Sequence, residues 1–346
     1  MNILSIALTI IYGVAIFCLL IFAHEIGHFS AAKATGVRVN EFALGMGPKL
    51  LKFRKGDTEY TLRAFPIGGF CAMEGEDADS EDPKAFNKKN VAQKALIIVA
   101  GASMNFLLAL VILSVVAFTN GVPTNVIAQV VPDTPAAEAG LLPGDEIIGV
   151  DGAAVEGWEQ MKSHIGKAGE RVELEILRDG QELSLETGSY LDGDGARKIG
   201  FNPATKVEAS DFLPSLKRGA QATGDMFGLI LYGLKMLFTG EASVKDLTGP
   251  VGIVNLMGQA AQNGFAMLMR LTAFISLNLA IVNMLPLPAL DGGRLVFLII
   301  RKIAGRRFTD EMEGRVHLVG MALLFGLMAF VLVQDIARAA LGHGIW

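Results

Sequence analysis

The chain has 346 residues, 51% of them hydrophobic and 19% charged, and its formal net charge is -5. Its mean hydropathy is +0.44 and its apolar residues are concentrated in long runs, which is typical of a membrane protein and not of a soluble core. An acidic balance offers no basic surface for DNA or RNA, so we expect no nucleic-acid partner.

The first apolar run, Met1 to Ala23, contains no charged residue and is long enough to cross a bilayer. A cleaved signal peptide is the alternative. However, no basic residue precedes the run, no persuasive small-residue cleavage site follows it, and the run is longer than the usual apolar core of a signal peptide. The run leads into His24-Glu25-Ile26-Gly27-His28. Helical residues four apart point within roughly 40° of each other, so both imidazoles can bind one metal ion while Glu25 faces a bound water. Two satisfied polar residues on a helix are the alternative.

Three further candidate spans follow in the chain, and the third of these four is interrupted by prolines. They are Ala95 to Phe118, Leu271 to Ile300 and roughly His317 to Val333. The run Met226 to Phe238 has too short an apolar part to span, so we predict an interfacial helix there. Cys18 and Cys71 are the only cysteines, one in a span and one outside it, and we expect no structural disulfide.

Basic residues predict the orientation of the spans. The segment between the first two spans carries Lys33, Arg38, Lys49, Lys52, Arg54, Lys55, Arg63, Lys84, Lys88, Lys89 and Lys94, and the connection before the last span carries Arg301, Lys302, Arg306, Arg307 and Arg315. Both segments should be cytoplasmic. The acidic stretch from Val122 to about Asp211 should then face outward, together with both termini.

The basic segment between the first two spans also contains an apolar stretch, Arg63 to Met73, with a pair of glycines at its centre. The pair suggests a hairpin that enters the cytoplasmic leaflet and offers an edge strand to an extended substrate, which makes Gly68, Gly69 and Phe70 candidate substrate-binding residues. A soluble hairpin on the cytoplasmic surface is the alternative.

The outward segment is predicted to be one small domain. Strands are expected at Val126–Val131, Glu146–Val150 and Val172–Leu177, a short helix at Pro135–Leu141, and turns at Pro143–Asp145 and Asp179–Gly180. The run Thr134–Ile148 closely resembles a PDZ domain. A PDZ fold implies a groove that accepts an extended chain as an added strand. The alternative, which the sequence leaves open, is a spacer that occludes the membrane site.

Two histidines leave a zinc ion one protein ligand short of the usual three. A third histidine close behind the motif is excluded, because Ala31 and Ala34 occupy the positions of the required glycine and histidine. His164 lies in the outward domain, and His317 and His343 have no motif around them. Asp291 is the strong candidate, since an ionisable group inside an apolar segment is costly unless it is paired or ligated.

The estimated membrane depths of His24 and Asp291 support Asp291 as the third ligand. From the outer face at Ile3, His24 lies roughly 30 Å along a helix, and Asp291 lies about as far from Leu271. Asn283, Pro286 and Pro288 precede Asp291, and the prolines should leave backbone groups unpaired, which is tolerated at membrane depth only beside protein or a wet cavity. We therefore regard four residues as candidate substrate-binding groups: Asn278, Asn283, Pro286 and Pro288. Asparagines that bridge transmembrane helices are the alternative.

The His24–His28 motif, the run Asn283–Gly293, the PDZ-like insertion and the run Gly249–Ile253 together resemble the site-2 protease family. The match is to its bacterial RseP/RasP branch of regulated intramembrane zinc metalloproteases, and it covers essentially the whole chain. The resemblance implies that His24, His28 and Asp291 bind Zn2+, that Glu25 is the general base, and that a membrane-reentrant β-loop contains the glycine pair. Some members carry two PDZ domains in tandem, so their control of substrate entry is not carried over.

We expect a polytopic α-helical membrane protein of about four transmembrane helices, with a cytoplasmic-side membrane-associated β-hairpin and an inserted extracytoplasmic α+β PDZ domain. The expected divisions are 1–121 (transmembrane helices 1 and 2, zinc motif and β-loop), 122–205 (PDZ domain), 206–265 (interfacial helix and linker) and 266–346 (transmembrane helices 3 and 4 with the third ligand).

The predicted function is that of a zinc-dependent intramembrane endopeptidase, which cleaves transmembrane segments of single-span proteins in the lipid bilayer. The resemblance implies a bacterial cytoplasmic (inner) membrane and a substrate such as a pre-cleaved anti-sigma factor or a remnant signal peptide. A catalytically inactive membrane-anchored PDZ scaffold is the main alternative, although it explains only the PDZ segment. A metal transporter would need neither Glu25 at its spacing nor a peptide-binding domain.

Overall fold

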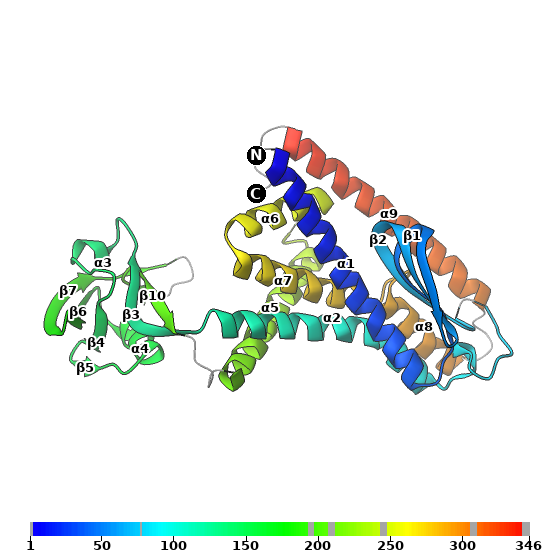
Figure 1. Ribbon diagram of the computed structural model, residues 1–346, viewed down its shortest axis with the longest axis horizontal. Helices are drawn as coiled ribbons and strands as arrows, with labels where there is room; N and C mark the ends of the chain where they lie inside the picture. The colour runs from blue at the N-terminus through cyan, green and yellow to red at the C-terminus, as the bar shows by residue number, and fades with distance from the viewer. Residues whose placement is uncertain are drawn as a thin grey trace. The chain divides into compact units, whose positions relative to one another are not determined.

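The computed structural model describes residues 3–76, 78–192, 197–206, 212–242, 248–304 and 310–340 (Figure 1). It divides into two compact units, one formed by Met1–Val116 with Gly219–Trp346 and the other by Ala117–Arg218. Six residues named above lie outside the described ranges: Met1, Asp211, Arg306, Arg307, His343 and Trp346.

Four helices of the first unit are long and apolar enough to cross a membrane, as predicted. They are α1 (Ile3–Ala34), α2 (Val91–Thr119), α7 (Phe265–Asn283) and α9 (Asp310–Ala340). The zinc motif lies inside α1, which continues past it to Ala34. Apolar residues surround α1 and α2 on all sides, which is typical of helices that face lipid or other apolar helices throughout.

The third predicted span is interrupted, as its prolines predicted, and consists of two helices. Helix α7 ends at Asn283, and α8 (Asp291–Ala304) starts with the predicted third ligand. Pro286 and Pro288 lie between them, and a proline cannot donate the backbone hydrogen bond that a continuous helix requires. The loop between α7 and α8, residues 284–290, therefore brings a helix N-terminus with its carboxylate to the end of α7.

Strands β1 (Val39–Lys55) and β2 (Thr58–Met73) form a sheet that folds back on itself. Leu44 pairs with Leu62 and also with Gly69, so the end of β2 lies on the other side of β1 from its start. The expectation of a hairpin turn at the glycine pair is corrected, because the turn joining the strands lies at Gly56 and Asp57. Both Gly68 and Gly69 lie within β2.

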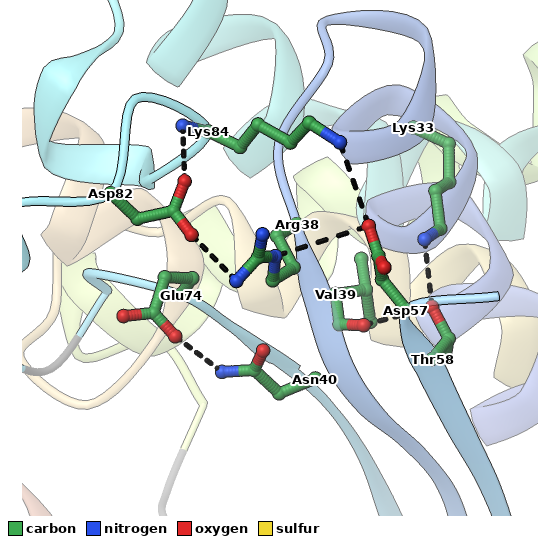
Figure 2. Close-up of polar contacts among 9 residues, drawn as sticks. All are labelled: Lys33, Arg38, Val39, Asn40, Asp57, Thr58, Glu74, Asp82 and Lys84. Atoms are coloured by element: carbon green, nitrogen blue, oxygen red, sulfur yellow. Dashed lines mark hydrogen bonds and ion pairs between the residues drawn. The ribbon is translucent and has the colours of Figure 1, made fainter. Parts of the chain in front are cut away.

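A network of polar contacts connects the base of this sheet to α1 and to the segment that follows β2 (Figure 2). The Arg38 guanidinium contacts Asp82 at 2.6 Å and Asp57 at 3.9 Å. Lys33 at the end of α1 donates to Thr58 Oγ1 at 2.7 Å, and that hydroxyl donates to the Val39 carbonyl at 2.8 Å. The Thr58 hydroxyl is buried, so these bonds are shielded from water and hold the sheet against α1.

Three further elements belong wholly or mostly to the first unit: the 3-10 helix η1 (Phe86–Lys88), α5 (Phe212–Thr239) and α6 (Pro250–Gln262). Helix α5 begins well before the predicted run Met226 to Phe238. Its Ile230 packs in one apolar cluster with Ala109 of α2 and Leu277 of α7. Met257 of α6 packs in another cluster with Leu20 of α1.

The second unit is an α+β domain whose main sheet has the strand order β10-β3-β4-β6-β7. Its elements are β3 (Val122–Val130), α3 (Pro135–Glu138), β4 (Glu146–Val150), β5 (Ala153–Ala154), α4 (Trp158–Lys167), β6 (Arg171–Arg178), β7 (Gln181–Gly188), β8 (Tyr190–Leu191), β9 (Arg197–Lys198) and β10 (Phe201–Lys206). The predicted strands, short helix and turns lie at these places. Ile147, Leu174 and Ile176 are fully buried in its core beside Met161 of α4.

Candidate metal centre

Three donor atoms from two distant parts of the chain converge beside α1. The Nε2 atoms of His24 and His28 lie 3.1 Å apart. The Asp291 Oδ2 atom is 3.2 Å from the first and 3.4 Å from the second. The three side chains are 11%, 12% and 16% exposed, so the donors are largely removed from water. Within the described residues, these three form the one His/Cys/Asp/Glu group with metal-binding geometry.

The triangle fits a zinc ion. Tetrahedral ligands at about 2.0–2.1 Å from zinc lie about 3.3–3.4 Å from one another, which is close to the three observed separations. Two imidazoles and a carboxylate are also a donor set typical of catalytic zinc, where three protein ligands leave the fourth position for water or substrate. Sequence spacing predicted the histidine pair, and the structure brings Asp291 to it.

The backbone of α2 makes room for the imidazoles. A side chain at Gly101 would place its Cβ 2.3 Å from His28 Nε2 and 2.8 Å from His24 Cε1, both closer than atoms can approach. Gly27 has the same function on the other helix, because its Cβ would lie 2.2 Å from the Ala100 carbonyl oxygen. The two glycines allow α1 and α2 to pack closely at the metal-binding face.

The ring of His28 is oriented from outside the triangle. Its Nδ1 lies 2.8 Å from the Ile97 carbonyl oxygen, which can only accept, so Nδ1 carries the proton and donates it. This tautomer leaves the Nε2 lone pair for a metal ion, the arrangement usual for zinc-bound histidines. The Nδ1 atom of His24 is buried and has no hydrogen-bond partner among the residues that the structure describes.

Glu25 lies beside the end of the β2 strand. A Cβ on Gly69 would be 3.3 Å from Glu25 Cγ and 2.9 Å from Ile21 Cγ2 of the same helix. The structure thus brings one predicted substrate-binding residue, Gly69, next to the predicted base. Gly69 pairs with Leu44 on one side, and no other strand pairing is described for it, so its far side is a sheet edge.

The other predicted substrate-binding residues are distributed over two elements. Gly68 and Phe70 flank Gly69 in β2, and the Arg63 guanidinium lies over the Phe70 ring at 4.9 Å. Asn278 lies within α7, and Asn283 is its last residue. Pro286 and Pro288 lie in the loop that leads to Asp291. Within the part of the chain that the structure describes, none of these residues is a donor of the metal triangle.

Cysteine chemistry does not contribute to this centre. Cys18 and Cys71 are both free, as expected from the sequence. Burial, together with the nearby carboxylates of Glu25 and Glu76, raises the pKa of the Cys71 thiol. Neither cysteine belongs to the group with metal-binding geometry among the described residues.

Asn105 is a buried polar residue of α2 that sequence reasoning did not single out. It follows Gly101 by four residues on α2, so it lies on the same helix face one turn away. It is fully buried, and neither its side-chain oxygen nor its nitrogen has a partner within the described part of the chain. A lone amide in an otherwise apolar span was the available signal, since such groups are costly in lipid and are usually functional.

Comparison with known proteins identifies the family. The model of peptidase family M50 matches residues 12–327. The chain belongs to this family. A candidate zinc metalloprotease of Clostridium perfringens is 40% identical over 94% of this chain and 98% of its own length. The regulator of sigma-W protease RasP of Bacillus subtilis is 31% identical over 95% of this chain and 98% of its own.

One solved structure is reported for comparison. The PDZ domain of an SdrC-like protein from Listeria monocytogenes is 24% identical, covers 24% of this chain and 87% of that domain, and has a TM-score of 0.21. The family match and the relatives make this M50 chain a zinc-dependent membrane protease, as the motif predicted. The prediction that it is an enzyme with a Zn2+ cofactor is confirmed.

Proposed function

We propose that His24, His28 and Asp291 hold the catalytic zinc ion of this M50 protease and that Glu25 is its general base. The observation that carries the assignment is the triangle of donor atoms, with edges of 3.1, 3.2 and 3.4 Å. Glu25 follows the first ligand directly in α1 and does not belong to the triangle. A carboxylate beside the ligands, and not among them, is free to accept a proton.

The zinc ion and Glu25 would have separate roles in peptide hydrolysis. When bound, zinc would polarise the scissile carbonyl and lower the pKa of an attacking water toward about 7. Glu25 would take the proton of that water and deliver it to the leaving nitrogen, so that the amine departs neutral. The three ligand side chains are only 11–16% exposed, so their surroundings exclude most bulk water.

A transmembrane substrate has to unwind before its peptide bonds can be reached, because a helix satisfies its own backbone groups. We assign the extended segment to the edge of β2 at Gly68, Gly69 and Phe70, since Gly69 lies beside Glu25. An added strand there would present its backbone to the metal triangle. Asn278, Asn283, Pro286 and Pro288 are proposed to contact the same segment from α7 and its following loop.

The proposed setting is the cytoplasmic membrane of a bacterium, with the β1–β2 sheet at the cytoplasmic leaflet and residues 122–205 as an extracytoplasmic PDZ domain. The excess of Lys and Arg between the first two spans supports this orientation. One relative is named a regulator of sigma-W protease, which supports single-span substrates of the anti-sigma factor type and, by the earlier resemblance, remnant signal peptides. The PDZ domain would contact such substrates or occlude the site.

Two variants test the assignment. Replacing Glu25 by Gln keeps the side-chain shape and all three ligands, so we expect full zinc content with cleavage of a single-span reporter reduced by at least about a hundredfold. Replacing Asp291 by Ala removes one ligand, so zinc content should fall as well. Near wild-type cleavage by the Glu25→Gln protein, measured in detergent or lipid vesicles, would show that another group is the base.

A further inference from the structure

Helix α9 has few contacts with the rest of its unit. Only 6% of its most apolar window is buried, against 33–44% for the other three candidate spans. Because so little of α9 is buried, a small number of contacts fixes its position in the unit. One group of contacts reaches the loop between α7 and α8, which precedes Asp291.

Two residues of α9 touch this loop directly. His317 accepts a hydrogen bond at Nδ1 from the backbone N–H of Ala289, at 2.8 Å. One turn further along, Gly320 packs so closely that a Cβ there would lie 2.3 Å from Pro288 Cβ. The imidazole also makes an edge contact with Phe297 of α8, with 5.1 Å between ring centroids.

The backbone of Ala289 needs such a partner. Its φ is +73°, in the left-handed region that a residue with a Cβ rarely adopts, and it comes two residues before Asp291. The next carbonyl, that of Leu290, accepts the Arg294 N–H at 3.2 Å and so opens α8. Whatever holds Ala289 in this conformation therefore also sets where α8 begins and where its first side chain points.

A cavity lies between the loop and α9. An apolar cavity of about 440 Å3 is lined by Leu287 and Pro288 on one side and by residues of α9, including Val316, Val319 and Leu323, on the other. The hydrogen bond from Ala289 to His317 is a polar contact that ties the loop to α9.

We propose that His317 is a positioning residue of the metal centre, which holds the Ala289 backbone so that Asp291 Oδ2 meets the two histidines. The proposal rests on the assignment of Asp291 as a zinc ligand under the proposed function. It gives the last helix, which contributes no ligand, a direct influence on metal affinity.

Two substitutions separate the hydrogen bond from the packing of the ring. In His317→Asn, Oδ1 is attached to Cγ just as Nδ1 is, so the acceptor is kept and the contact with Phe297 is lost. In His317→Phe, an aromatic ring is kept and the acceptor is lost. Leu318→Ala is the matched control, because Leu318 neighbours His317 and is 66% exposed. The full chain is purified in detergent, and the zinc dissociation constant is measured by competition with a chelator.

We expect His317→Phe to weaken zinc binding about 10–100-fold, the range seen when groups that orient a ligand are removed. His317→Asn and Leu318→Ala should stay within a few-fold of wild type. Equal affinities for His317→Phe and wild type, or equal losses for both His317 variants, would overturn the proposal. Asp291→Ala is measured in parallel: if it binds zinc as wild type does, the proposed function fails and the positioning role fails with it, whereas a loss confined to Asp291→Ala sinks only the positioning role.

Discussion

Gly101 shows how strictly single residues shape the metal centre. A methyl group there would lie 2.3 Å from His28 Nε2, and neither the α2 backbone nor a metal-bound ring can retreat without breaking the triangle. We expect Gly101→Ala to lower zinc affinity at least about tenfold and to reduce activity in parallel. Zinc content after purification measures the first effect directly.

The matched control for that substitution is Gly228→Ala in α5. Gly228 has no atom within 4 Å of its hypothetical Cβ, and alanine is the better helix former by about 1 kcal/mol. Its zinc content should equal that of wild type. Equal zinc contents in the Gly101→Ala and wild-type proteins would mean that the two imidazoles are held elsewhere.

Asp145 carries a pH-dependent part of the stability of the second unit. Its side chain is 1% exposed, and it accepts two 2.7 Å bonds from Arg178 and one of 2.8 Å from the Leu142 N–H. Burial alone would raise the pKa of Asp145, but these donors outweigh it and the pKa lies below its ordinary value. A lowered native pKa stabilises the fold at pH above the unfolded value, near 4, and this contribution is lost as the pH falls below it.

Asp145→Asn should therefore reduce the unfolding free energy of the second unit by about 1–3 kcal/mol at pH 7, with the difference shrinking below about pH 4. Trp158 reports unfolding, since its ring packs against Phe201 at 6.3 Å. Trp346, the other of the two tryptophans, would be replaced by Phe in both proteins. A difference that is constant from pH 7 to pH 3 would contradict a charged, hydrogen-bonded Asp145.

At the scale of elements, helices α6 and α9 are joined by a buried carboxylate. Asp335 of α9 is fully buried and accepts the N–H groups of Gly249 and Gly252, at 3.3 and 2.9 Å, at the N-terminus of α6. Gly249 has no side chain to cap its own helix, so α9 supplies the cap. Both N–H groups would be left without this acceptor if Asp335 were apolar.

We expect Asp335→Leu to lower the midpoint of thermal unfolding in detergent, because each buried unsatisfied donor costs about 1–3 kcal/mol. Asp335→Asn keeps one acceptor and should lose less. Val333→Ala, at a 66% exposed position of the same helix, is the control and should change little. A greater loss for Asn than for Leu would show that Asp335 has a different main partner.

The elements of the membrane unit were predictable in part. A charge-free run and two histidines four apart are local signals, and α1 carries both as expected. Pro286 and Pro288 likewise predicted the break before Asp291. The doubled sheet was not predictable, because Leu44 pairs with residues on both sides through a register that only long-range packing sets. The partners of His317 and Asp335 could not be predicted for the same reason. A single polar residue in an apolar run does not indicate which distant backbone group it will hydrogen-bond.

At the scale of the whole molecule, hydropathy and the family resemblance predicted the architecture: about four apolar helices and an inserted α+β unit. Turn residues predicted much of the inserted unit, including the positive-φ pair Asp179 and Gly180. The chemistry of the centre was also readable, because residue types limit it. Its geometry was not, since His24 and Asp291 meet only when α1 and the start of α8 pack together.

We propose that this centre cuts peptide bonds inside a membrane-spanning segment, and mapping the position of the cut bond tests this most directly. Purified protein in lipid vesicles is incubated with a single-span reporter, and mass spectrometry identifies the new termini. We expect termini within the apolar segment for the wild-type protein and none for Glu25→Gln. Termini confined to the soluble flanks, or the same termini with both proteins, would contradict the assignment.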